Sequence, residues 1–276
     1  MPELPEVEIA ARNLRRWGLA RRVEGAECEQ AARRLVRPLS PRTFTARLAG
    51  ATLREVRRTG KHLLLTLEAA GGPLGLSSHL GMTGKWVRRA GGEEPPSHSR
   101  VRLLLDDGAT LHYRDPRLFG RLQLVPGARF EELPELRALG PDPLEQGIDP
   151  ARLAAALGRA RRPVKVALLD QRLLPGVGNI YASEALFRAR VDPARPAASL
   201  SRAEVRRLAA SILEAFRHAI ALEDGPEITY VEEPGAPNPF LVYGHEGARC
   251  PRCRKAAIAR TVQGQRSTYH CPACQR

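Results

Sequence analysis

Apolar residues recur at helical spacing close to the beginning of the chain and again across its second half. One face of a helix over residues 5–17 would carry four of them, Val7, Ala11, Leu14 and Trp17. Pro5 suits the first turn of this helix, where its missing N–H would have no intrahelical partner. The same spacing predicts helices over residues 150–158, 163–173, 179–189 and 201–222. Ser201 and Glu204 have the spacing of a capping box for the last of these.

Residues 20–126 follow a different pattern, in which short apolar or alternating runs are separated by turns. The runs occupy residues 63–67, 101–105, 110–113 and 122–125. Glycine-containing turns such as Gly71-Gly72 lie between them, which is typical of antiparallel strands. The pattern predicts a β-sandwich preceded by a helix.

Proline and glycine cluster at residues 134–150, where the strand pattern gives way to the helical one. We therefore expect a linker at residues 133–150. The fold class that follows is an α+β multidomain chain in three folded parts. These are an N-terminal β-sandwich with its leading helix over residues 1–132, a helical domain over 151–240 and a C-terminal β-hairpin module over 241–276.

The charge balance favours a polyanionic partner. The 276 residues have a formal net charge of +14, and only four of the 44 basic residues are lysine: Lys61, Lys85, Lys165 and Lys255. Such an excess indicates binding to DNA or RNA, although an arginine-rich proteome gives the same bias without it. The sequence contains neither a membrane-length apolar run nor a signal-peptide pattern, so we expect a cytoplasmic, nucleoid-associated bacterial protein.

Four of the five cysteines stand near the end of the chain in two Cys-x-x-Cys pairs: Cys250, Cys253, Cys271 and Cys274. Two such knuckles joined by a short arm predict a site for one Zn²⁺ ion. Four thiolates complete a tetrahedron and leave no position for water, so the ion is expected to be structural. The fifth cysteine, Cys28, has no partner in the sequence and reads as a small buried residue.

Pro2 is a candidate nucleophile at the other end of the chain. A small residue after the initiator Met1 favours removal of Met1, which would leave Pro2 as a secondary amine with a pKa of about 7.7–8.0. Its neutral form can attack an electrophilic carbon, and Glu3 and Glu6 stand close enough in the sequence to move protons. The same residues are equally compatible with acids at the N-terminus of a solvated helix.

Six segments, in order, resemble motifs of the formamidopyrimidine-DNA glycosylase (Fpg, MutM) family. They are Met1–Glu8, Thr59-Gly60-Lys61-His62-Leu63, His79–Gly84, Asp115–Gly120, Gly176–Glu184 and the four-cysteine hairpin. The resemblance covers nearly the whole chain. It implies a monomeric base-excision repair enzyme that acts on double-stranded DNA containing damaged bases. Such an enzyme flips an oxidised purine out of the duplex, cleaves its glycosidic bond and nicks the backbone by β,δ-elimination.

The resemblance also implies catalytic roles. Pro2 would attack C1′ and form a Schiff base, Glu3 would protonate the sugar ring oxygen as it opens, and Glu6 would orient the amine. Lys61 would donate a proton during β-elimination, although by itself it reads as a charged residue at a strand edge. Arg266 would clamp the phosphates beside the lesion and assist δ-elimination.

DNA-binding residues follow from the same resemblance. Met82, Arg117 and Phe119 resemble the family's intercalating set. Its apolar members would fill the gap left by the extruded nucleotide, and Arg117 would hydrogen-bond the orphaned base, expected to be cytosine. Taken singly, Met82 and Phe119 read as core residues. His98 lies in a loop before a strand, where an exposed histidine is also ordinary. In the helix–two-turn–helix region, the backbone amides before Asn179 could bind a phosphate, and Lys165 and Arg161 add positive charge. The three arginines at residues 159–162 are also compatible with a helix face that is simply exposed to solvent.

Several positions depart from the family pattern. Leu118 replaces a second basic residue, Arg254 replaces the usual glycine after the first knuckle, and the 17-residue spacer between Cys253 and Cys271 is one residue longer than usual. We therefore expect a distorted knuckle that still binds zinc. The stretch 224–240, which would cap the flipped purine, does not match the family.

Two alternatives stay open at this point. One is an endonuclease VIII-like glycosylase for oxidised pyrimidines. Its sequence pattern is less similar, because Leu4, Met82 and the pair Arg117 and Phe119 favour the purine-specific branch. The other is a catalytically silent paralogue that binds damaged DNA through the same scaffold.

Overall fold

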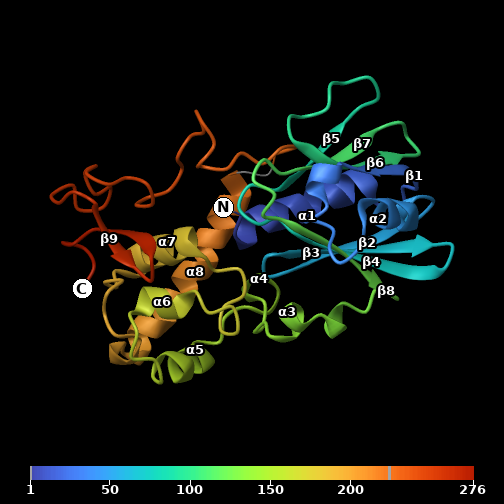
Figure 1. Ribbon diagram of the computed structural model, residues 1–276. Helices are drawn as coiled ribbons and strands as arrows, with labels where there is room; N and C mark the ends of the chain where they lie inside the picture. The colour runs from blue at the N-terminus through green and yellow to red at the C-terminus, as the bar shows by residue number, and fades with distance from the viewer. Residues whose placement is uncertain (1, 223–224) are drawn as a thin grey trace. The chain divides into compact units, whose positions relative to one another are not determined.

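The structure, a computed structural model, describes residues 2–222 and 225–276. The described chain divides into two compact units (Figure 1). Unit 1 comprises Pro2 and residues 6–137 and 225–234, and unit 2 comprises residues 3–5, 138–222 and 235–276. The domain limits expected at residues 132, 150 and 240 stay predictions. Within the described ranges no helix is both long and apolar enough to cross a membrane.

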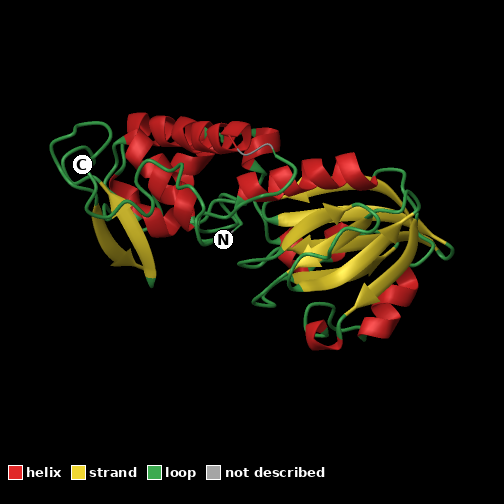
Figure 2. Ribbon diagram, turned by 90° about the horizontal axis from the view of Figure 1, so that it is seen from above, coloured by secondary structure: helices red, strands yellow, loops and turns green. Residues whose placement is uncertain are grey.

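Unit 1 contains two antiparallel four-stranded sheets, as the strand runs predict. The first has the order β1 (Val23–Cys28), β6 (Ser99–Leu105), β7 (Thr110–Arg114), β5 (Lys85–Arg89). The second has the order β2 (Thr52–Thr59), β3 (His62–Ala69), β4 (Gly72–His79), β8 (Arg121–Pro126). Figure 2 shows these strands gathered into one body with helices at its margins.

One hydrophobic core joins the two sheets to helix α1 (Leu4–Gly18). Leu65 of β3, Leu103 of β6 and Leu14 of α1 all lie in it and are at most 3% exposed. The predicted β-sandwich with a leading helix is therefore confirmed. Cys28, at the end of β1, packs against this core but is half-buried rather than buried.

Helix α2 (Pro41–Leu48) lies within the region that the pattern assigns to strands. Its signals are local and specific: the Ser40 hydroxyl accepts from the Thr43 N–H at 3.1 Å, and Pro41 occupies the first turn. Two 3₁₀ turns, η1 (Gln30–Ala32) and η2 (Phe130–Glu132), and the short helix α3 (Pro134–Arg137) complete unit 1.

Unit 2 is helical, with a two-stranded hairpin near the end of the chain. Its elements are α4 (Pro143–Gln146), α5 (Pro150–Leu157), α6 (Val164–Leu168), α7 (Asn179–Ala189), η3 (Ala197–Ser199), α8 (Arg202–Leu222), β9 (Ala259–Gln263) and β10 (Arg266–His270). The capping box of α8 is confirmed, because the Ser201 N–H donates to Glu204 at 2.8 Å and the Glu204 N–H donates to the Ser201 hydroxyl at 3.3 Å.

Helix α6 ends at Leu168, earlier than the predicted helix over residues 163–173. The carboxylate of Asp170 accepts from the Arg172 N–H at 3.1 Å, which starts a turn instead of a further helical turn. The apolar spacing continues beyond the end of α6, since Leu174, after this turn, is 2% exposed.

The stretch after α8 contains no helix or strand among residues 225–242. Asp224, where the unmatched stretch begins, lies outside the described residues. Ile228 and Tyr230 nevertheless insert into the core of unit 1, at 3% and 5% exposure. Half of the stretch therefore packs with the sandwich, and the other half belongs to unit 2.

Candidate active site and metal centre

Pro2 and Glu3 directly precede α1. Pro2 is buried, Glu3 is fully buried, and Glu6 in the first turn of the helix is 5% exposed. Met1 lies outside the described residues, so its removal stays a prediction. Burial of Pro2 disfavours a charged amine there, whereas the neighbouring carboxylates of Glu3 and Glu6 favour one.

The carboxylate of Glu3 caps helix α7. Its two oxygens accept from the backbone N–H groups of Gly178 at 2.7 Å, Ile180 at 2.8 Å and Tyr181 at 3.2 Å. The N-cap residue, Gly178, has no side chain to do this. The Glu3 carboxylate thus accepts three backbone hydrogen bonds at the positive end of the α7 helix dipole.

The turn before α7 is shaped around the beginning of the chain. The N–H of Leu4 donates to the carbonyl of Gly176 at 3.1 Å. Gly176 has φ +89°, and a Cβ atom there would lie 2.4 Å from the Cβ of Leu4. Only glycine fits this approach, which explains one glycine of the Gly176-Val177-Gly178 motif.

Lys165, Asn179 and Arg266 lie together in unit 2. Lys165 is fully buried, and its Nζ donates to Oδ1 of Asn179. The amide of Asn179 donates in turn to the carbonyl of Ser267, next to Arg266 on β10, at 3.0 Å. Burial and then the charge of Arg266 lower the pKa of Lys165, the charge of Glu3 raises it, and the net value is about 8. Lys165 would have to leave Asn179 to reach a phosphate.

Arg161 and Arg266 are exposed, Arg161 on the turn that precedes α6. Both guanidinium groups are therefore placed where an external anion could approach. Asn179 itself is 7% exposed at the first position of α7.

Lys61 lies at the tip of the hairpin that joins β2 and β3, where Thr59 pairs with His62. His62 and His79 face each other across β3 and β4, with ring centroids 4.9 Å apart. Burial, together with the charges of Lys61 and Arg121, lowers the pKa of His79 to about 4. The imidazole beside Lys61 is therefore neutral at physiological pH.

Asp115 joins the two loops that carry Met82, Arg117 and Phe119. It is fully buried; its Oδ1 accepts from the Thr83 hydroxyl at 2.7 Å and from the Arg117 N–H at 3.2 Å. The Met82 loop and the Arg117–Phe119 loop are thereby held side by side in unit 1.

The tip of this loop pair is apolar and exposed. Phe119 is 51% exposed, and the guanidinium of Arg117 lies 4.7 Å from its ring centroid. Met82 is half-buried beside it, in a loop where Gly81 packs on the Phe119 backbone: a Cβ atom on Gly81 would lie 2.5 Å from the Phe119 carbonyl. An exposed phenylalanine backed by arginine is a suitable group to insert into a base stack.

His98 is exposed and has φ +59°, and its carbonyl accepts from the Asp115 N–H at 3.1 Å. The loop that carries it is thus anchored to the same aspartate. The side chain is exposed, and its contact with DNA stays a prediction.

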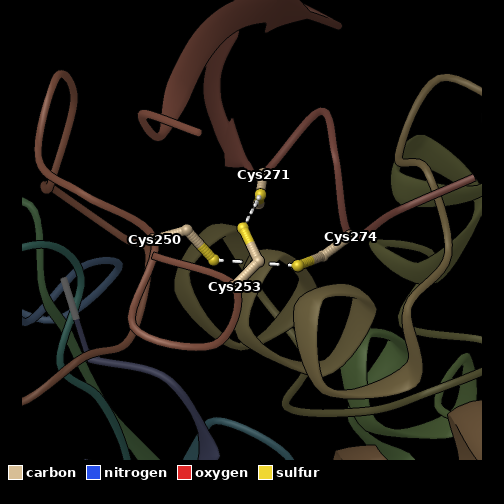
Figure 3. A group of neighbouring side chains, drawn as sticks. All are labelled: Cys250, Cys253, Cys271 and Cys274. Carbon is tan, nitrogen blue, oxygen red and sulfur yellow. Dashed lines mark hydrogen bonds between the residues drawn. The ribbon is translucent and has the colours of Figure 1, made fainter. Parts of the chain in front are cut away.

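The four cysteines form one cluster (Figure 3), with all sulfur atoms within 4.8 Å of one another. The sulfur atoms of Cys250 and Cys274 lie 3.8 Å apart, and so do those of Cys253 and Cys271. A tetrahedron with metal–sulfur bonds of about 2.3 Å has edges of about 3.8 Å, so the donor set fits a zinc ion. The cluster could therefore hold a metal ion, and the longer spacer does not prevent the sulfur atoms from converging.

Both knuckles are fastened to the end of helix α7. Arg252 donates to the Phe187 carbonyl at 2.7 Å, and its guanidinium lies 4.4 Å from the Phe187 ring centroid. Gln275, beside the second knuckle, donates to the Val191 carbonyl at 2.8 Å. The C-terminal module thus contacts both ends of α7, because Asn179 at the beginning of the helix donates to the carbonyl of Ser267.

Three residues of the site were not foreseen from the sequence. Asp115, His79 and Glu184 all lie in segments that resemble family motifs, but the resemblance implies no role for them. Glu184 on α7 accepts from three successive backbone N–H groups, those of residues 241–243, at 3.0, 2.8 and 3.0 Å. The spacing of residues in the sequence cannot predict such long-range hydrogen bonds to backbone amides.

Family models match two parts of the chain. The model described as formamidopyrimidine-DNA glycosylase N-terminal domain matches residues 1–122, and that described as formamidopyrimidine-DNA glycosylase H2TH domain matches residues 139–230. A protein named formamidopyrimidine-DNA glycosylase from Thermus thermophilus is 42% identical over 282 residues, covering 100% of this chain and 98% of the relative.

Solved structures agree. The crystal structure of the MutM (Fpg) protein from Thermus thermophilus has a TM-score of 0.81 at 41% identity, covering 99% of this chain and 98% of that one. The Fpg of Lactococcus lactis, solved in complex with DNA containing N7-benzyl-Fapy-dG, has a TM-score of 0.86 at 29% identity, with each chain covered completely.

Proposed function

This chain belongs to the formamidopyrimidine-DNA glycosylase family, and we propose that it removes oxidised purines from duplex DNA and nicks the resulting abasic site. The substrates are 8-oxoguanine and formamidopyrimidines. The observation that carries the proposal is the full-length match, within which the chain retains Pro2, Glu3, Lys61 and the four cysteines in order. The alternatives, a pyrimidine-specific enzyme and a silent paralogue, are not favoured.

The proposed reaction begins at Pro2. Its neutral nitrogen attacks C1′, the glycosidic bond breaks with its electron pair going to the base, and the sugar ring opens to an iminium ion. This cation withdraws electrons from C2′, so loss of a C2′ proton expels the 3′ phosphate, and loss of a C4′ proton then expels the 5′ phosphate. Water finally hydrolyses the imine and frees the amine.

Glu3 has two tasks in this scheme. As the cap of α7 it holds the beginning of the chain against the Gly176–Asn179 turn. To protonate the sugar ring oxygen it must first carry a proton, and its hydrogen bonds from the three amides are then weaker, because a neutral carboxyl group is a poorer acceptor than a carboxylate. We assign Glu6 the orientation of the amine and Lys61 the proton transfer in β-elimination.

DNA contacts are proposed at both units. Met82, Arg117 and Phe119 fill the space of the extruded nucleotide, supported by the exposed apolar tip that Asp115 holds together. His98, Arg161, Lys165, Asn179 and Arg266 contact phosphates, with Arg266 also assisting δ-elimination. The net charge of +14 favours the encounter with DNA.

The metal is proposed to be one Zn²⁺ ion with a structural role. Cys250, Cys253, Cys271 and Cys274 would hold it, and its binding would fix the hairpin that carries Arg266. The protein is proposed to act as a monomer in the bacterial cytoplasm, in association with the nucleoid.

Borohydride trapping tests the function. The purified protein is incubated with duplexes that contain 8-oxoguanine opposite cytosine, thymine glycol, or no lesion, and the reduced adduct is measured. A covalent adduct with 8-oxoguanine supports the proposal, and Pro2→Gly should sharply reduce it while Pro5→Ala, a change at the next proline, should not. An adduct with thymine glycol alone, or binding without any adduct, would overturn it.

A further inference from the structure

Arg58 on β2 is the largest side chain that the described residues bury almost completely, at 1% exposure. Its Nε donates to Oε2 of Glu8 at 2.9 Å, and one terminal nitrogen donates to the carbonyl of Gly60 at 3.2 Å. A guanidinium ion cannot shed its charge, so burial is tolerated only with such partners. The group is inaccessible to DNA, and its role must be internal.

Glu8 fastens β2 to α1. It lies on α1, one and a half turns after the first residues of the chain, and also accepts from Arg12 at 3.2 Å. A second bond runs beside it, from Nε of Arg15 to the carbonyl of Val56 at 2.8 Å. The helix that follows Pro2 and the strand that leads to Lys61 are thereby joined by charged and neutral hydrogen bonds, all within unit 1.

The bond to Gly60 extends this connection to the hairpin tip. Thr59 pairs with His62, so Gly60 and Lys61 form a two-residue loop, and Gly60 has the positive φ of +55° that such a loop requires. Arg58 holds the carbonyl of this loop with one arm of its guanidinium while the other arm holds Glu8. A lysine, with a single ammonium group, could not span both partners in this way.

We propose that Arg58 is a positioning residue that fixes the Lys61 hairpin relative to α1, and thus relative to Pro2. The inference rests on the proposed roles of Pro2 and Lys61. The competing reading is that the ion pair contributes only to folding, where apolar residues of similar volume often serve as well.

The test compares Arg58→Met with Arg57→Met, which changes the neighbouring, more accessible arginine of the same strand. Two single-turnover rates are measured: formation of the reducible adduct on 8-oxoguanine, and nicking of a duplex with a preformed abasic site. A misplaced Lys61 should slow nicking about tenfold or more relative to adduct formation, because displacements on the order of 1 Å cost about a hundredfold in rate. Arg57→Met should leave the ratio unchanged.

Two further variants keep the test decisive if Arg58→Met does not fold. Glu8→Gln removes one charge while preserving the shape of the side chain. Arg58→Lys keeps the positive charge but loses the planar guanidinium group that contacts two partners at once. Both should shift the ratio in the same direction, the lysine variant less. An unchanged ratio in folded variants, whatever happens to the melting temperature, would overturn the inference while leaving the proposed function intact. Wild-type protein without any adduct would instead overturn the proposed function.

Discussion

Replacing Arg254 by glycine should stabilise the metal-binding module. Arg254 follows the first knuckle, has φ +55°, and is exposed. Its N–H donates to the carbonyl of Cys250 at 2.9 Å, so the knuckle itself requires the left-handed conformation. Such a conformation costs a residue with a Cβ atom about 1–2 kcal/mol, and glycine avoids this cost.

The gain is partly offset in the unfolded chain. Glycine loses about 0.5–1 kcal/mol more backbone entropy on folding than other residues do. The net stabilisation of Arg254→Gly is then about 0.5–1 kcal/mol, which corresponds to roughly 1–4 °C in the melting temperature of a unit of this size. By the same free energy, extraction of the metal by a chelator should be about two- to fivefold less favourable.

The assay is thermal unfolding of the zinc-loaded protein, together with chelator titration. Lys255→Gly is the matched control, because Lys255 is also exposed, stands next in the chain and is not among the residues with positive φ. This control should lose about 0.5–1 kcal/mol. A melting temperature of Arg254→Gly at or below that of wild type, or equal to that of the control, would refute the reasoning from backbone strain.

Two other predictions concern buried charges. Glu3→Gln should lower the free energy of unfolding by about 1–3 kcal/mol, because a carboxamide brings an N–H donor against the amides that cap α7; an unchanged unfolding curve would contradict the cap. The second concerns Lys165, whose pKa of about 8 lies below the ordinary value of 10.5. Between these values the unfolded state binds more protons than the folded state, so stability rises with pH through this window. Lys165→Met should remove this rise in a series of unfolding curves between pH 8 and 10.5, and a variant with the wild-type slope would show that Lys165 titrates normally.

Much of the fold was predictable because its signals are local. The helices α1, α5, α7 and α8 follow from apolar spacing, and the metal cluster follows from two Cys-x-x-Cys pairs whose sulfur atoms do converge. Helix α2 was missed although Phe44 and Leu48 have helical spacing, because it lies inside a region whose other apolar runs indicate strands; its cap at Ser40 is the specific local signal. For α6 the apolar spacing predicted too long a helix, because that spacing continues through the turn that begins at Asp170.

The site was predictable only as far as single motifs reach. That Glu3 caps a helix beginning at Asn179 depends on bonds between residues about 175 positions apart in sequence. Asp115 and Arg58 act on neighbouring loops in the same indirect way. Sequence motifs identify residues that contact a substrate, whereas the carboxylates and guanidinium groups that hold them become visible only when the backbone they bind is in place.

Peptide mapping of the borohydride-reduced adduct by mass spectrometry tests the central claim most directly. The account predicts a sugar remnant on the nitrogen of Pro2, in a chain from which Met1 is absent. A remnant on a lysine such as Lys61, or an active preparation in which every chain retains Met1, would contradict it.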